Sequence, residues 1–195
     1  EDLDSLLERE GRLPLERALA LAAPIGAALD YAWERRKLVH RDIKPGNVFV
    51  TAKGEVKLLD FGIAARVRPA TGHAAAEAPG SSGTAGYRAP EAGAPRREPS
   101  QALDVYAVAV MIYQMLEGRL PASANPARPA ALSQQQWAVL ASGFAADSGA
   151  RPPTVTKLVA ALREAAQDQA PPQAEVVHHD VPSPAEQLAK IARQK

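Results

Sequence analysis

The sequence lacks several features that would assign a protein to a special class. It contains no cysteine, which excludes disulfide bonds, thiolate metal sites and a cysteine nucleophile, and which fits a reducing compartment with the cytoplasm as the default. No run of 18 apolar residues occurs and the first residues, EDLDSLLERE, are charged, so neither a membrane span nor an export signal is predicted. The 23 Lys and Arg residues nearly balance the 22 Asp and Glu residues, so no strong field favours nucleic acid or an anionic membrane.

What remains is the composition of an ordinary folded protein. Hydrophobic residues make up 46% of the chain and charged residues 23%, which is enough to bury one core. Apolar residues recur at helical spacing in several stretches, and we expect helices at 1–10, 14–36, 102–117, 133–144 and 153–166. Shorter β-type runs predict strands at 37–40, 47–50 and 56–60. The predicted fold class is α+β, mainly α-helical with short β-hairpins.

Two stretches interrupt this pattern. Residues 63–82 are rich in Ala, Gly, Pro, Ser and Arg without periodicity, and they predict a long loop of the kind that is functional or disordered. Residues 167–195 are rich in Pro and Gln, which predicts a linker or tail that could end in a short helix. The predicted folded domain therefore covers residues 1–166.

The most distinctive polar stretch is HRDIKPGN at 40–47, between two predicted strands. Phosphoryl transfer from a magnesium nucleotide needs a carboxylate to accept the proton of the attacking hydroxyl, a cation near the phosphoryl group, and oxygen ligands for the metal. Asp42 offers the carboxylate, Lys44 the cation, and Asn47 an amide oxygen suited to magnesium. Asp60, at the end of the third predicted strand, offers the carboxylate that the metal still needs.

Three blocks of residues carry a resemblance to a known family. They are HRDIKPGN at 40–47, DFG at 60–62 and GTAGYRAPE at 83–91, and they occur in the family's order. On these blocks the chain resembles the eukaryotic-type (Hanks-type) serine/threonine protein kinases of bacteria, over residues 1 to about 165. The resemblance implies the fold of the large, C-terminal lobe of a protein kinase, with an activation segment at 60–91.

The resemblance also implies an activity and a set of roles. The family transfers the γ-phosphoryl group of ATP, with Mg²⁺, to Ser or Thr hydroxyls of protein substrates. Asp42 would be the catalytic base and Lys44 would contact the phosphate, while Asn47 and Asp60 would bind the metal and, through it, the nucleotide. Thr84 would brace Asp42 and Lys44 and favour Ser and Thr over Tyr as acceptors.

Other residues match positions of structural support or regulation in the family. His40 would pack within the loop, Asp104 would brace the loop from a buried helix, and Arg151 would pair with Glu91. Arg41 precedes the base, which implies that a phosphate on the activation segment would order the loop. The candidate hydroxyls for this phosphate are Thr71, Ser81, Ser82 and Thr84.

The family's small N-terminal lobe has no match in this sequence. Neither a GxGxxG loop nor a VAIK-like strand with its lysine is present, so we expect the large lobe alone, with little nucleotide binding or turnover by this chain by itself. A pseudokinase or docking module without catalysis is therefore the alternative function. A third hypothesis, a small-molecule phosphotransferase, shares the Asp and Asn geometry but gives no reason for Lys44 or for GTAGYRAPE.

Overall fold

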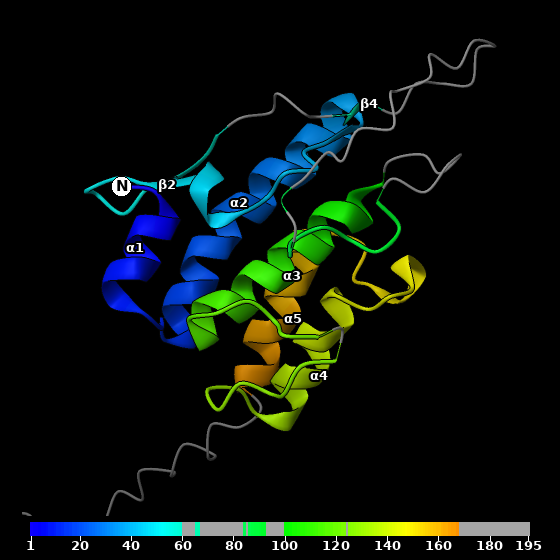
Figure 1. Ribbon diagram of the computed structural model, residues 1–195. Helices are drawn as coiled ribbons and strands as arrows, with labels where there is room; N and C mark the ends of the chain where they lie inside the picture. Colours follow the sequence, from blue (N-terminus) through cyan, green and yellow to red (C-terminus); the bar gives the residue numbers. More distant parts are fainter. Residues whose placement is uncertain (60–64, 67–83, 85, 93–99, 124, 168–195) are drawn as a thin grey trace, which may run out of the picture.

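The fold is given by a computed structural model, which describes residues 1–59, 65–66, 84, 86–92, 100–123 and 125–167. Its α-helices, in chain order, are α1 (Leu3–Glu10), α2 (Leu15–Arg36), α3 (Gln101–Glu117), α4 (Gln134–Gly143) and α5 (Val155–Gln167). Helix α5 packs against α2, α3 and α4, and α2 also packs along α3 (Figure 1). None of the helices in the described part of the chain combines the length and the apolarity that crossing a bilayer requires.

The strands are short and form two antiparallel pairs. Strand β1 (Leu38–Val39) pairs with β4 (Ala65–Arg66), and β2 (Val48–Val50) pairs with β3 (Val56–Leu58) in a hairpin. The described residues also form the 3-10 turns η1 (Pro45–Asn47), before β2, and η3 (Ser148–Ala150), before α5. The structure therefore agrees with a mainly helical chain that carries small antiparallel sheets.

The predicted elements lie within two residues of the observed ones at each end. Helix α2 was expected to start at Pro14, but it starts at Leu15. Pro14 has an extended backbone and is the N-cap residue just before the helix. One prediction was wrong: residues 63–82 were expected to form an irregular loop throughout, but residues 65–66 form β4. A two-residue strand is too short to produce a periodic pattern, and the rest of that loop lies outside the described residues.

Helix α3 forms the centre of the core. Its sequence is apolar on nearly every side, which predicts a helix enclosed by protein. The side chains that are at most 1% exposed along this helix are Val105, Val108, Ala109, Val110, Met111, Ile112 and Met115. Helix α3 ends at Glu117, and the left-handed backbone of Gly118 caps its last turn.

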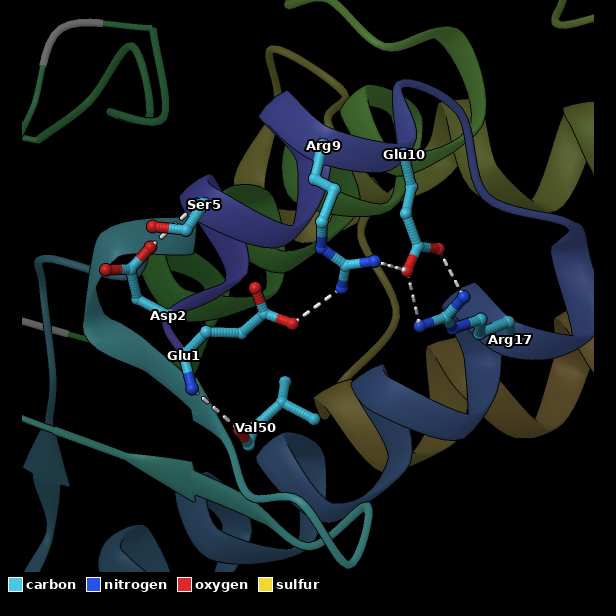
Figure 2. A network of polar contacts seen from close by, with 7 residues as sticks. All are labelled: Glu1, Asp2, Ser5, Arg9, Glu10, Arg17 and Val50. Carbon is cyan, nitrogen blue, oxygen red and sulfur yellow. Dashed lines mark hydrogen bonds and ion pairs between the residues drawn. The ribbon is translucent and has the colours of Figure 1, made fainter.

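A chain of exposed ion pairs joins α1 to the start of α2 (Figure 2). Arg9 lies between two acids, with Nη2 2.6 Å from Glu1 Oε1 and Nη1 2.9 Å from Glu10 Oε1. Glu10 in turn pairs with Arg17 on α2. Exposed pairs contribute little stability each, so this network orients α1 more than it stabilises the fold.

Helices α3 and α4 approach so closely that one of them needs a glycine at the contact. A Cβ on Gly143 would stand only 2.6 Å from the Cβ of Ala109. We expect Gly143→Ala to lower the free energy of unfolding by about 1–3 kcal/mol, because the extra methyl group forces the helices apart. Urea denaturation followed by circular dichroism measures this loss.

Two further variants sharpen this prediction. Ala109→Gly should recover part of the loss in the Gly143→Ala background, because it removes the other half of the clash. Gly149→Ala is the matched control, since its new Cβ would meet its nearest neighbour, Asp147 Oδ1, at an ordinary 3.5 Å. Equal stability of Gly143→Ala and wild type would contradict the close contact.

Candidate active site

The 40–47 loop leaves β1 and reaches β2 through η1. His40 is fully buried, and Ile43 and Asp42 are 1% and 8% exposed. The loop is thus held inside the protein in spite of its polar sequence. Burying polar groups is unfavourable unless they are hydrogen-bonded, so its partners determine its geometry.

Asp104, in the first turn of α3, holds the start of the loop. Its Oδ2 accepts the backbone N–H of His40 and its Oδ1 accepts that of Arg41, each at 2.9 Å. Arg41 has φ +71°, a left-handed conformation that is unfavourable for a residue with a side chain. The backbone N–H groups of His40 and Arg41 both donate to this one buried carboxylate, and these two hydrogen bonds offset the backbone strain at Arg41.

His40 links the loop to the end of β3. The backbone N–H of Asp42 donates to His40 Nδ1 at 3.3 Å, and His40 Nε2 lies 3.1 Å from the carbonyl oxygen of Leu59. Because Nδ1 accepts a hydrogen bond, the proton of the neutral ring is assigned to Nε2, which donates to that carbonyl. Asp60 follows Leu59 directly in the sequence.

The Asp42 carboxylate is the centre of the polar network in the site. Its Oδ1 accepts the backbone N–H and the hydroxyl of Thr84, each at 3.1 Å. Its Oδ2 lies 3.1 Å from Lys44 Nζ and accepts from Asn47 Nδ2 at 3.1 Å. Lys44 Nζ also donates to the Thr84 hydroxyl at 2.9 Å, so that hydroxyl accepts one hydrogen bond and donates another.

This network sets the ionisation of Asp42. Burial by itself raises the pKa of the carboxyl, but the hydrogen bonds from Lys44 and Thr84 and the charge of Lys44 outweigh burial. The pKa of Asp42 therefore lies below its usual value, and the group is a carboxylate at neutral pH. It can orient a hydroxyl group and accept its proton.

Asn47 has an amide group of fixed orientation. Its Nδ2 donates to the backbone carbonyl of Asp42 at 2.7 Å as well as to the Asp42 carboxylate. The nitrogen is thereby assigned to the Asp42 side, and the amide oxygen Oδ1 is left as an acceptor on the other side of the group. The backbone N–H of Leu59 donates to the Asn47 carbonyl at 2.8 Å, which joins the loop to the end of β3.

A buried ion pair fixes the end of the 83–91 block. The guanidinium of Arg151 pairs with both oxygens of Glu91, at 2.6 Å and 2.8 Å. Arg151 also donates to the carbonyls of Ala145 and Ala102 and lies over the ring of Tyr106, 4.9 Å from its centroid. An arginine with a bidentate ion pair and further hydrogen bonds to backbone carbonyls holds a defined geometry, which a lysine cannot reproduce.

The structure brings most of the predicted site residues into one region. The loop residues and their direct partners are His40, Arg41, Asp42, Lys44, Asn47, Thr84 and Asp104. Asp60, Thr71, Ser81 and Ser82 lie outside the described residues. Among the residues that are described, no three or more His, Asp or Glu side chains are grouped so that they could hold a metal ion.

Comparison with known families agrees with this arrangement. The family model described as protein kinase domain matches residues 1–181. The chain belongs to the protein kinase domain family.

Relatives of this kinase domain are bacterial enzymes named as serine/threonine kinases. Kinase PknA of Corynebacterium glutamicum is 35% identical over 216 residues, which cover 99% of this chain and 44% of the relative. PknA of Mycobacterium tuberculosis is 41% identical over 132 residues, covering 68% and 30%. Kinase PksC of Streptomyces coelicolor is 35% identical over 184 residues, covering 91% and 31%. The chain spans less than half the length of these relatives.

Two residues beside the loop of this kinase domain were not singled out from the sequence. Asp4 on α1 places Oδ2 only 3.1 Å from the point where a Cβ on Gly46 would stand. Phe49 on β2 is 38% exposed, which is unusual for so large an apolar side chain. Phe49 lies between Val48 and Val50 on a strand, so its side chain was expected on the opposite face from theirs, and this alternation could have indicated its exposure. Nothing near Asp4 in the sequence indicates a contact with Gly46.

The buried Asp104 predicts a pH dependence of the stability of the kinase domain. Burial raises the pKa of Asp104 from 3.8 to about 6, against the two backbone N–H groups that lower it. Between these values the folded state binds the proton more tightly than the unfolded state, so the contribution of Asp104 to stability is fully present below about pH 4 and is lost as the pH rises through about 6. We expect Asp104→Asn to remove this decline, in urea denaturation between about pH 4 and pH 7.

The variant should also lower stability at the acid end of this range. An amide offers one oxygen to the backbone N–H groups of His40 and Arg41, so one of them loses its acceptor. Asp147→Asn is a suitable control, because Asp147 is exposed and also accepts a backbone N–H, from Gly149. An unchanged pH slope in Asp104→Asn would show that the buried carboxyl does not titrate in this range.

Proposed function

We propose that this chain is the large lobe of a serine/threonine protein kinase, which transfers the γ-phosphoryl group of Mg-ATP to Ser or Thr hydroxyls of proteins. The observation that carries the proposal is the set of contacts around the Asp42 carboxylate. Thr84 donates hydrogen bonds to it, and Lys44 forms an ion pair with it and a hydrogen bond to Thr84. These contacts place an ionised carboxylate and an ammonium group side by side, as transfer of a phosphoryl group to a hydroxyl requires.

Asp42 is proposed to orient the acceptor hydroxyl and to take up its proton. As the hydroxyl oxygen forms its bond to the γ-phosphorus, the bond from that phosphorus to the bridging oxygen breaks, and the hydroxyl proton moves to Asp42. A carboxylate with a lowered pKa is a weak base, so its main contribution is orientation before the transfer. Lys44 Nζ lies beside Oδ2 of Asp42, where its charge would stabilise the transferred phosphoryl group.

The residues present fit a magnesium ion. Asn47 turns its amide nitrogen to Asp42, which leaves the amide oxygen for a metal that prefers oxygen ligands. Asp60, the second proposed ligand, follows Leu59, whose backbone N–H bonds to Asn47. Magnesium bound to these two residues would neutralise charge on the phosphate oxygens.

One face of the β2–β3 hairpin carries exposed apolar side chains that could contact a nucleotide. Side chains alternate across the strands, so Phe49 and Lys57, which are directly opposite, share one face, and Leu59 lies next along it. Phe49 and Leu59 are both exposed, at 38% and 44%. We propose that the side chains of Phe49, two residues from Asn47, and Leu59 pack against the base of ATP. The small-lobe contacts of the nucleotide would come from residues outside this chain.

Substitution of the proposed base gives the main test. Asp42→Asn keeps the shape and the hydrogen bond from Thr84, but an amide nitrogen replaces one of the carboxylate oxygens that orient the acceptor hydroxyl and take up its proton, so kcat should fall by about 10² to 10⁴-fold. The measurement is transfer of labelled phosphate from ATP to a generic protein substrate, by the enzyme expressed from its complete gene. Glu164→Gln, on the exposed side of α5, is the control. Equal turnover by Asp42→Asn and wild type would rule out the proposed base, and a wild type without any transfer would favour a docking module.

Thr84 offers a second, independent test. Thr84→Val removes the hydroxyl that donates to Asp42, so the pKa of Asp42 should rise. Because the base must be ionised, the acid limb of the pH profile of kcat should move to higher pH. Thr84→Ser keeps the hydroxyl and should leave the limb in place. A Val variant that only destabilises the fold would leave the position of this limb unchanged.

A further inference from the structure

The start of α1 lies along the segment that carries Asn47. The backbone nitrogen of Glu1 donates to the carbonyl of Val50 at 3.1 Å (Figure 2). The N–H of Val50 donates back to the carbonyl of Glu1 at 2.8 Å. Asp2 then begins the helix, with Oδ1 accepting the N–H of Ser5 at 2.7 Å (Figure 2). Residues 1–2 therefore extend the β2–β3 hairpin, and the first turn of α1 faces η1.

Asp4 points from this first turn at the middle of η1. Its Oδ2 occupies the space beside Gly46, 3.1 Å from where a Cβ would be. Gly46 does not have a left-handed φ, so its backbone conformation does not require glycine. The Asp4 carboxylate is the group that a side chain at this position would meet, so it would have to shift to make room.

The groups around Asp4 act on the pKa of its carboxyl in both directions. Partial burial and the neighbouring carboxylates of Asp2 and Glu8 raise the pKa of Asp4 above its usual value, although Lys44 and the backbone N–H of Gly46 act in the opposite direction. The side chain is exposed and adds nothing to the core, which α1 contacts through Leu3, Leu6 and Leu7. Its favourable partners are thus a residue of η1 and the residue that precedes η1.

We propose that Asp4 is a positioning residue for Asn47 and Lys44, acting through the backbone of Gly46. The inference rests on the proposed function, because positioning matters only if these two residues serve phosphoryl transfer. Lys44 precedes η1 and Asn47 is its last residue, so a contact on Gly46 fixes both ends of the turn. Asn47 is then held from three directions, by Asp42, by Leu59 and, through Gly46, by α1.

Asp4→Ala tests this inference with two readouts. Loss of the contact should speed amide hydrogen exchange at Gly46 and Asn47 by about tenfold, measured on this chain without nucleotide or metal. In the enzyme expressed from its complete gene, the Mg²⁺ concentration for half-maximal transfer should rise by about tenfold, as for other partners that orient a metal ligand indirectly. Thermal unfolding should shift little, because Asp4 lies outside the core.

Matched variants separate the contact from charge alone. Asp4→Asn keeps an oxygen for the Gly46 N–H and should restore most of both readouts, whereas Glu8→Gln removes a carboxylate one turn away and should change neither. Gly46→Ala should disturb the turn by itself, and adding Asp4→Ala should add no further increase in exchange, because the two changes break the same contact.

The outcomes distinguish failure of this inference from failure of the proposed function. Unchanged exchange at Gly46 in Asp4→Ala would overturn the contact, whatever the activity. Faster exchange with an unchanged Mg²⁺ requirement would overturn the positioning of Asn47. A wild-type enzyme that transfers no phosphate would overturn the proposed function, and with it the positioning role, although the exchange data would still decide the contact itself.

Discussion

The hydrogen bonds from the His40 and Arg41 backbone to Asp104 are the constraint on which the site depends. They hold Arg41 in a left-handed conformation, and this turn directs the next residue, Asp42, toward Thr84 and Lys44. Keeping Asp104 charged in the core is unfavourable by about 3 kcal/mol at neutral pH, as the pKa of about 6 implies. The rest of the helical core supplies the stability that makes this arrangement tolerable.

The site is assembled from segments far apart in the sequence, each attached to a rigid element. Asp42 belongs to a loop braced by α3, and Thr84 belongs to a block whose far end is locked by the Arg151–Glu91 pair. The hydrogen bonds between Asp42 and Thr84 join these two segments directly. A shift of α3 or of the Arg151–Glu91 pair would therefore change the position of the Asp42 carboxylate, because its hydrogen bonds leave it little freedom to adjust.

The sequence predicted the helices well, since their apolar spacing is a local property that survives packing. It failed for β4, where two residues gain their conformation only by pairing with β1. The grouping of Asp42, Thr84 and Asp104 was expected only from resemblance to a family, because no local pattern relates positions so far apart. The contact of Asp4 with Gly46 had neither kind of signal, and it required the structure.

The close contact between Ala109 and Gly143 has a consequence for how this sequence can change. Methyl groups at both positions would clash, and a methyl group at position 143 would also stand 3.2 Å from Leu158, so a side chain there requires glycine at position 109 and a small shift of Leu158. A lineage that exchanges the two residues must pass through a state with glycine at both positions or with a methyl group at both. The first intermediate leaves a small void and the second a clash, so the order of the two mutations decides whether the path is open.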